Sequence, residues 1–141
     1  MKLHEVITTA KSIIAEISEL EGVQIFDDPA DMKRKLETAI QERGLALVLI
    51  QESGIPTEPS SPDLLLKNLL IVSVLENTKT NTNGPSALQA TGLILKAVNQ
   101  YFWRSPGLKN ALTVDNPAYT RGELETGLTT YFCNFLIKTI E

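Results

Sequence analysis

The stretch "LALVLIQESGIPTEPSSPDLLLKNLLIVSVLE" (residues 45–76) decides the fold. Residues 45–51 are apolar until Gln51 and too few for an independent helix, so they predict a central strand covered on both faces. Residues 52–63 hold three prolines, one glycine and three serines, which predicts a loop or an extended arm. Residues 65–76 predict a second strand. Nothing between the two strands can form a crossover helix, so we expect an antiparallel hairpin with an extended tip.

An amphipathic helix is expected before this hairpin. Apolar residues in the N-terminal segment recur at spacings of three and four, which predicts a helix that ends near Gly22; they are Leu3, Ile7, Ala10, Ile14 and Ile17. We expect this apolar stripe to pack on the protein's own sheet rather than on a neighbouring subunit.

A short strand and a second helix are expected between the first helix and the hairpin. Residues 23–26 predict the strand, and residues 27–44 predict the helix. Asp28 is suited to cap this helix, and Pro29 suits its first turn. Gly44 is expected to end it.

A polar segment and a third helix follow the hairpin. Residues 77–83 carry amide and hydroxyl side chains with little charge, and Gly84 and Pro85 then predict a helix that ends at residues 104–107. Gly92 costs this helix about 1 kcal/mol relative to alanine, which predicts close packing at that point. Its inner face is expected to hold Ala87, Leu88, Ile94, Leu95, Val98, Tyr101 and Phe102.

The chain is expected to end in two further strands. These are residues 111–114 and the alternating run 127–140, joined by a polar connection over residues 115–126. The order of elements predicts an α+β or mixed α/β fold: a mainly antiparallel sheet with a long β-hairpin, flanked by about three helices. We expect residues 1–141 to form one domain.

Composition argues against several classes of function. The chain has 141 residues, 43% hydrophobic content and a net charge of −4, so nucleic acid is a poor candidate for a partner. The basic run Lys33 to Lys35 is interpreted as the solvated face of a helix. No run approaches the 18 or so apolar residues of a membrane span, so we expect a soluble protein with no membrane partner. Cys133 is the only cysteine and is interpreted as a small core residue.

The sequence shows no catalytic motif. His4 is the only histidine, and no nucleophile elbow, P-loop or zinc-protease motif is present. Glu123 and Glu125 are interpreted as solvated acids rather than metal ligands. Trp103 at the end of the third helix suits a partner contact, but a plug beneath the sheet is the favoured interpretation. We therefore expect no enzyme activity, no cofactor and no metal site, and assembly or binding is the favoured class.

The arrangement of elements resembles the tail terminator and minor tail proteins of tailed bacteriophages and phage-like contractile particles. The segments that carry the resemblance are "LHEVITTAKSIIAEISEL", "GLALVLIQESG", "NLLIVSVLEN", the polar segment, "PSALQATGLILKAVNQYF" and "GLTTYFCNFLIKTIE", which together span nearly the whole chain. That family has no invariant catalytic or ligand motif, so the resemblance transfers no residue roles.

The resemblance implies a structural role in the virion tail, assembled in the cytoplasm of a host bacterium. Subunits would form a homo-oligomeric ring, commonly of six copies, on the head-proximal end of the tail tube. The ring would end tube growth and join the tail to the neck or head connector. Its implied partners are the tube protein, the connector protein and, in contractile tails, the sheath protein, with DNA only passing through its lumen.

A ring requires two different patches on each subunit. The candidate assembly residues are Asn77, Lys79, Asn81, Asn83, Ile55, Trp103, Arg104 and Arg121. The polar segment is expected either to order on assembly or to be a solvated turn. Two alternatives stay open: another tail, neck or baseplate component, and a small soluble ligand-binding domain.

Overall fold

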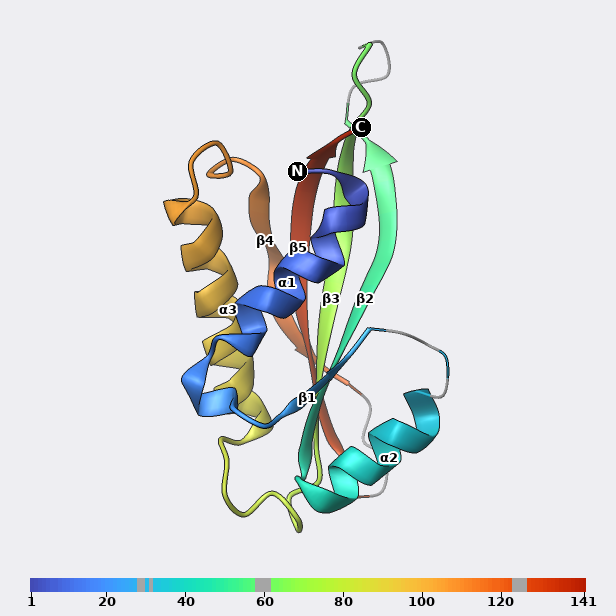
Figure 1. Ribbon diagram of the computed structural model, residues 1–141, viewed down its shortest axis with the longest axis vertical. Coiled ribbons are helices and arrows are strands. Elements are labelled where there is room, and N and C mark those ends of the chain that lie inside the picture. The colour runs from blue at the N-terminus through green and yellow to red at the C-terminus, as the bar shows by residue number, and fades with distance from the viewer. Residues whose placement is uncertain (28–29, 31, 58–61, 123–126) are drawn as a thin grey trace.

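The computed structural model describes residues 1–27, 30, 32–57, 62–122 and 127–141. These residues form an α+β fold with a sheet in the strand order β1-β2-β3-β5-β4 (Figure 1). The strands are β1 (Gln24–Phe26), β2 (Leu45–Pro56), β3 (Leu65–Glu76), β4 (Leu112–Arg121) and β5 (Thr129–Ile140). The α-helices are α1 (Val6–Ala15), α2 (Met32–Glu42) and α3 (Ala87–Arg104), with short 3₁₀ turns on either side of α1 (Leu3–Glu5 and Ser18–Leu20). Within the described residues, only the short pair of β1 and β2 is parallel. The predicted fold class is therefore confirmed.

The β2–β3 hairpin is the longest feature of the sheet, and its prediction is confirmed. Its antiparallel register runs from Leu45 opposite Glu76 to Pro56 opposite Leu66. Residues 52–56 form the extended arm of the two alternatives predicted, because β2 continues to Pro56 after a bulge between Gln51 and Ser53. Hydrogen bonding to β3 compensates for the weak strand preference of glycine and proline there. Residues 58–61 of the predicted tip lie outside the described residues.

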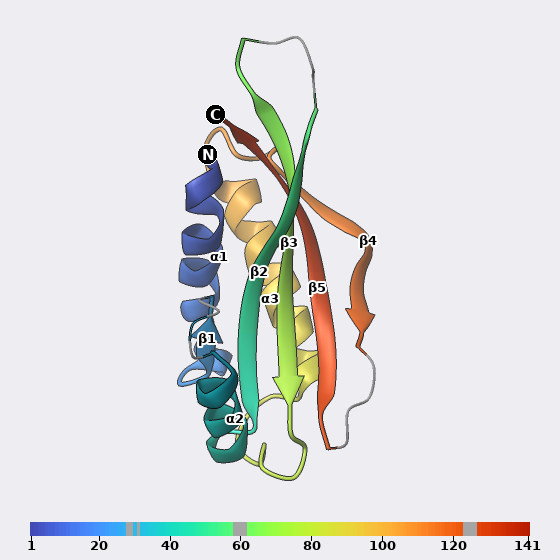
Figure 2. The same ribbon diagram turned by 90° about the vertical axis from the view of Figure 1, so that its right-hand side faces the viewer.

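The main core lies between α1, α3 and one face of the sheet (Figure 2). Leu45, Leu47 and Leu49 of β2 are buried there, next to Val72, Val74 and Leu70 of β3. The alternation predicted for β5 is confirmed, since Cys133, Phe135 and Ile137 enter the same core. The apolar stripe of α1 packs here as well, as expected, through its buried residues Val6, Ala10, Ile13 and Ile14.

The opposite face of the sheet is covered only in part. α2 packs over one end of it, where Ala39 and Ile40 contact Ala46 of β2. Ala46 therefore confirms that β2 begins as a strand buried on both faces. Farther along, Ile50 of β2 lies opposite Ile71 of β3 on this face and keeps 43% of its surface exposed. We call this part, where no described helix packs, the open face.

Two element boundaries differ from the predictions. α1 ends at Ala15 rather than near Gly22. Between Ala15 and Val23 the chain instead forms a 3₁₀ turn and two hydrogen-bonded turns. β4 does not stop at residue 114 but continues to Arg121. Its register against β5 shifts between Val114 and Tyr119, so the "DNPA" segment bulges out of the ladder and pairing then resumes.

α3 also departs from its prediction. It begins at Ala87 with Ser86 as its N-cap, where Ser86 Oγ accepts from Gln89 N at 3.2 Å, so Pro85 precedes the helix. Leu88 and Tyr101 are exposed rather than inward-facing. Gly92 is exposed and a Cβ there would meet nothing within 4 Å, so the predicted close packing at this glycine is wrong.

The second helix ends close to its predicted stop. α2 ends at Glu42, and Gly44 follows with a φ of 82°. The predicted caps Asp28 and Pro29 lie outside the described residues. Gly44 is also required sterically, because a Cβ at this position would overlap the backbone nitrogen of Asn81 and lie 2.6 Å from the Asn81 Cβ. The end of α2 and the polar segment after β3 are thus in direct contact.

We expect Gly44→Ala to lower the free energy of unfolding by about 3 kcal/mol or more, because it combines positive-φ strain with a backbone clash. Gly92→Ala is the matched control. It should raise stability by about 0.5–1 kcal/mol, since Gly92 is in a helix with open space around it. Urea denaturation of both variants measures the two effects. Equal stability of the two variants would contradict the contact between Gly44 and Asn81.

Candidate assembly surfaces

The polar segment after β3 is organised by the carboxylate of Glu76. Glu76 is the last residue of β3 and is buried, with 7% of its surface exposed. Its Oε1 accepts from the backbone N–H of Ala87 at 3.0 Å, and its Oε2 accepts from Asn81 Nδ2 at 2.7 Å. A buried carboxylate is stable only when donors satisfy it, and here the first turn of α3 and the polar segment supply them.

Further hydrogen bonds attach the same segment to the α2–β2 junction. Asn77 N donates to the carbonyl of Gly44 at 2.9 Å, and Thr80 Oγ1 donates to the carbonyl of Ile40 at 2.9 Å. Asn81 Nδ2 also donates to the carbonyl of Pro85 at 2.9 Å. These bonds explain why the segment is rich in amides and hydroxyls. The side chains satisfy backbone groups where the chain changes direction between a buried strand and a buried helix.

The four candidates in this segment therefore fall into two groups. Asn77 and Asn81 are half-buried, and their side chains bond within the subunit; Asn77 Oδ1 accepts from Lys79 N at 3.0 Å. Lys79 and Asn83 are exposed. Only the exposed pair, together with the neighbouring Thr78 and Thr82, offers side chains to another molecule without breaking the fold.

Ile55 lies on the hairpin opposite Lys67, and 61% of its surface is exposed. The hairpin is fixed at this point by Asn68, whose Nδ2 donates to the carbonyl of Ile137 at 3.0 Å and to Thr139 Oγ1 at 2.9 Å. A Cβ on Gly54 would lie 2.6 Å from Asn68 Oδ1, so the small residue lets the two strands approach. The hairpin thus holds Ile55 on a rigid support.

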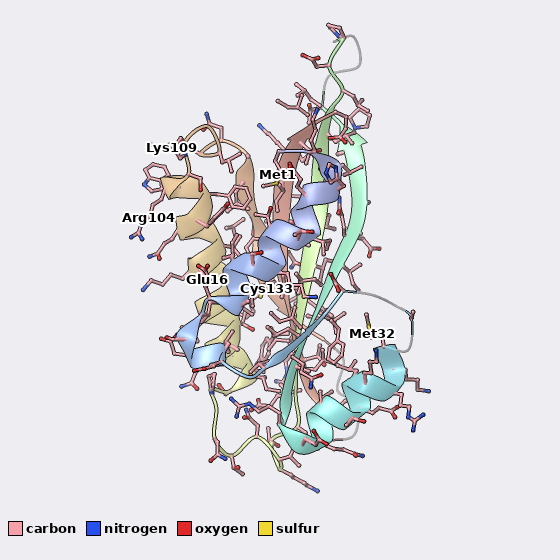
Figure 3. The ribbon with its side chains drawn as sticks, viewed as in Figure 1. Met1, Glu16, Met32, Arg104, Lys109 and Cys133 are labelled. Atoms are coloured by element: carbon pink, nitrogen blue, oxygen red, sulfur yellow. The ribbon has the colours of Figure 1, made fainter. Side chains whose placement is uncertain are left out.

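Trp103 and Arg104 lie at the C-terminal end of α3. The interpretation of Trp103 as a plug beneath the sheet is wrong, because 65% of its surface is exposed. Trp103 is on the outward side of the helix, and Lys109 Nζ lies 5.1 Å from its ring centroid. Figure 3 shows Arg104 and Lys109 near this end of α3, directed away from the sheet.

The eight candidates do not form one surface. Arg121 is exposed at the end of β4, opposite Tyr131 and thus toward the end of the sheet that carries the polar segment. Ile55 lies near the opposite end of the sheet, and Trp103 and Arg104 lie on α3. Ile50 and Lys109, which the sequence analysis did not single out, are exposed as well.

The structure offers little for catalysis within its described part. No group of three or more His, Cys, Asp or Glu side chains that could hold a metal ion occurs among the described residues. Glu123 and Glu125 lie outside the described residues. None of the helices in the described part combines the length and apolarity that crossing a membrane requires. His4 is exposed and distant in sequence from Cys133, which is buried.

One groove runs between α1 and α3. Its volume is about 670 Å³, and it opens broadly to solvent. Hydroxyl groups of Thr8, Ser12 and Ser105 line it, together with Glu16 and Arg104. These side chains give the groove a partly polar lining.

No protein-family model matches this chain, and no curated protein matches it either.

We expect Glu76→Gln to lower the free energy of unfolding by about 1–3 kcal/mol, because the new amide can accept from only one of the two donors. Lys79→Ala is the control in the same segment and should change stability by less than about 0.5 kcal/mol, since Lys79 is exposed. Chemical denaturation measures both values. A Glu76→Gln variant as stable as the parent would show that this carboxylate does not organise the segment.

Cys133 should make stability fall with rising pH. Burial raises the pKa of its thiol from 9.0 to about 12, partly opposed by a hydrogen bond with Thr91. Above pH 9 the unfolded chain loses the thiol proton while the folded chain keeps it, so deprotonation favours unfolding. Between pH 7 and pH 10 this contribution should cost about 1.4 kcal/mol.

Denaturation at the two pH values should therefore be carried out on the parent protein and on Cys133→Ala. The alanine variant is less stable at both pH values because it loses core packing, but its decrease between them should be smaller by this amount. An identical pH dependence of the two proteins would refute the protonated, buried thiol.

Proposed function

We propose that this chain is a structural protein of a tailed bacteriophage or phage-like particle. In this proposal it forms a ring, with six copies as the expected number, on the head-proximal end of the tail tube. The ring ends tube growth and provides the surface on which the neck or head connector docks. Its partners are further copies of itself, the tube protein, the connector protein and, in a contractile tail, the sheath protein.

The observation that carries this proposal is the presence of exposed apolar side chains on two different outer surfaces. Trp103 lies on α3, and Ile50 and Ile55 lie on the hairpin. A head-to-tail ring needs such a pair of unlike patches, whereas a two-fold dimer uses one patch twice. Exposed Trp residues are also among the commonest anchors of protein interfaces.

The order and pairing of elements also support the proposal. The resemblance to tail terminators rests on an opening helix, a long hairpin, a polar segment, a long helix and a closing strand, and the structure contains them in this order. The hydrogen bonds of the polar segment and of Asn68 make this frame rigid. A rigid frame limits the entropy lost when subunits associate.

A groove between α1 and α3 favours a second candidate function, the binding of a small polar ligand. Its volume of about 670 Å³ is in the range of ligand sites. A ligand screen read by NMR shifts at Thr8, Ser12 and Ser105 tests this candidate. A hit confined to these residues, in a protein that remains monomeric, would favour ligand binding over assembly.

We expect the purified protein to associate as its concentration rises, with a closed species of about 93 kDa if six copies of the 15.5 kDa chain form the ring. Native mass spectrometry measures the copy number, and electron microscopy shows whether the species is annular. Added to a polymerising tube protein encoded beside it, the chain should bind one tube end and stop growth there.

Two results would contradict the proposal. The first is a chain that remains monomeric at millimolar concentration and also fails to bind tube ends. The second is a compact two-fold dimer, because a dimer that uses one patch twice cannot cap a tube. An annular species that does not bind tail tubes would instead favour the other assembly role, in the neck or baseplate.

A further inference from the structure

Two outer patches of the subunit are complementary in chemistry. The first, called the α3 patch, consists of Trp103, Arg104 and Lys109. The second, called the arm patch, consists of Ile50, Glu52 and Ile55 on β2. All six side chains are exposed. Each patch combines an apolar centre with charge of one sign.

The apolar members have no role in the subunit's own core. Trp103 exposes 65% of its surface and Ile55 exposes 61%. Neither belongs to the buried clusters or to the residues packed against them. Burial of these side chains against a partner would remove apolar surface from water, which favours association.

The charges of the two regions have opposite sign. Residues 87–110 contain Lys96, Arg104 and Lys109 and no acidic residue. Residues 50–64 contain Glu52, Glu58 and Asp63 and no basic residue. The nearest lysine beyond this region is Lys67 of β3, opposite Ile55. Of the three acids, Glu52 is the one that lies on β2, and it supplies the negative charge of the arm patch.

The two patches also lie on opposite sides of the molecule. Figure 1 shows α3 along one side and β2 along the other, with β4, β5 and β3 between them in this view. One patch can therefore contact a neighbour on its left while the other contacts a neighbour on its right. This placement suits a contact that repeats head to tail rather than one that closes as a pair.

Direct strand pairing between neighbours is disfavoured at this edge. β1 pairs only with Ala46 to Val48, so the outer edge of β2 beyond Val48 carries no strand of the described chain. That edge contains the bulge at Glu52 and ends in Pro56, which has no N–H to donate. Bulges and prolines are features that block strand addition. A neighbour must therefore bind here through side chains.

We propose that the α3 patch of one subunit binds the arm patch of a second copy of this chain, and that this contact closes the ring. This inference rests on the proposed function, and it specifies the interface. Trp103 packs against Ile50 and Ile55 of the neighbour, and Arg104 and Lys109 lie against its Glu52. A second copy fits better than a foreign protein, because both halves of the complementary pair occur on the same chain.

Charge reversal at each patch tests the proposal. Glu52→Arg alone and Arg104→Glu alone should each weaken self-association at least about tenfold, because each places like charges in contact. The double variant Glu52→Arg/Arg104→Glu should restore association to within a few-fold of the parent. Native mass spectrometry and sedimentation over a concentration series measure the association.

Mixing supplies a second readout. The Glu52→Arg and Arg104→Glu proteins, each defective alone, should associate with each other, because in the mixture the side chains at positions 52 and 104 that meet have opposite charges. The mixed ring alternates the two proteins in equal numbers, which only an even copy number permits. Lys33→Glu and Glu37→Arg on α2 are the matched controls and should leave association unchanged, since both residues are exposed and outside the patches.

The outcomes separate the interface from the function. If the parent protein forms annular particles and neither charge reversal changes its association, the proposed contact is wrong and the proposed ring function is unaffected. Weakening by both reversals without rescue in the double variant or the mixture also overturns the contact, because the two residues then act at separate contacts. A parent that never associates, with or without a tube protein, overturns the ring function and this contact together. Circular dichroism confirms that each variant is folded.

Discussion

The buried carboxylate of Glu76 is the constraint on which the rest of the structure depends. It ends β3 inside the protein, where an unpaired charge would cost several kcal/mol. Its two oxygens are satisfied by the N–H of Ala87 and the amide of Asn81. Because Ala87 is the first residue of α3, this single side chain fixes where the helix begins relative to the end of the sheet. The packing of Ala90, Ile94 and Val98 in the main core then sets the direction of α3 across the sheet, and so the position of Trp103 at its far end.

The hydrophobic pattern was sufficient to predict the fold class because burial dominates the central strands. β2 and β3 carry continuous apolar runs and β5 alternates, and both patterns are typical of strands packed on one core. The strand extensions whose extent the sequence did not predict, 52–56 and 119–121, lie where pairing rather than burial holds the chain. Glycine and proline in residues 52–56 have low strand preference, and only the neighbouring strand, invisible in local sequence, compensates for it.

The candidate surfaces were harder to predict for two physical reasons. α3 has apolar residues around most of its circumference, so helical spacing alone could not show that Leu88 and Tyr101 face outward while Ala90 and Thr91 face the core. The polar segment was ambiguous for a different reason. An asparagine that hydrogen-bonds to buried backbone and an asparagine that binds a partner cannot be told apart in the sequence. The hydrogen bonds of Asn81 assign it to the first group, whereas Lys79 and Asn83 stay available to a partner.

The exposed edges of β2 and β4 bear on how copies in the proposed ring would associate. The outer edge of β2 carries a bulge and ends in Pro56, and β4 carries a register shift and Pro117. Both edges are thereby poor templates for strand addition, which would otherwise join copies in any number and register. Once backbone pairing is blocked, specificity rests on the few exposed apolar and charged groups that a rigid frame holds at fixed positions. A ring of defined size requires such specific side-chain contacts, because its closure depends on one repeated angle between neighbouring subunits. Side-chain patches on a rigid sheet and helix set that angle more narrowly than a strand edge, along which a neighbour can pair in several registers.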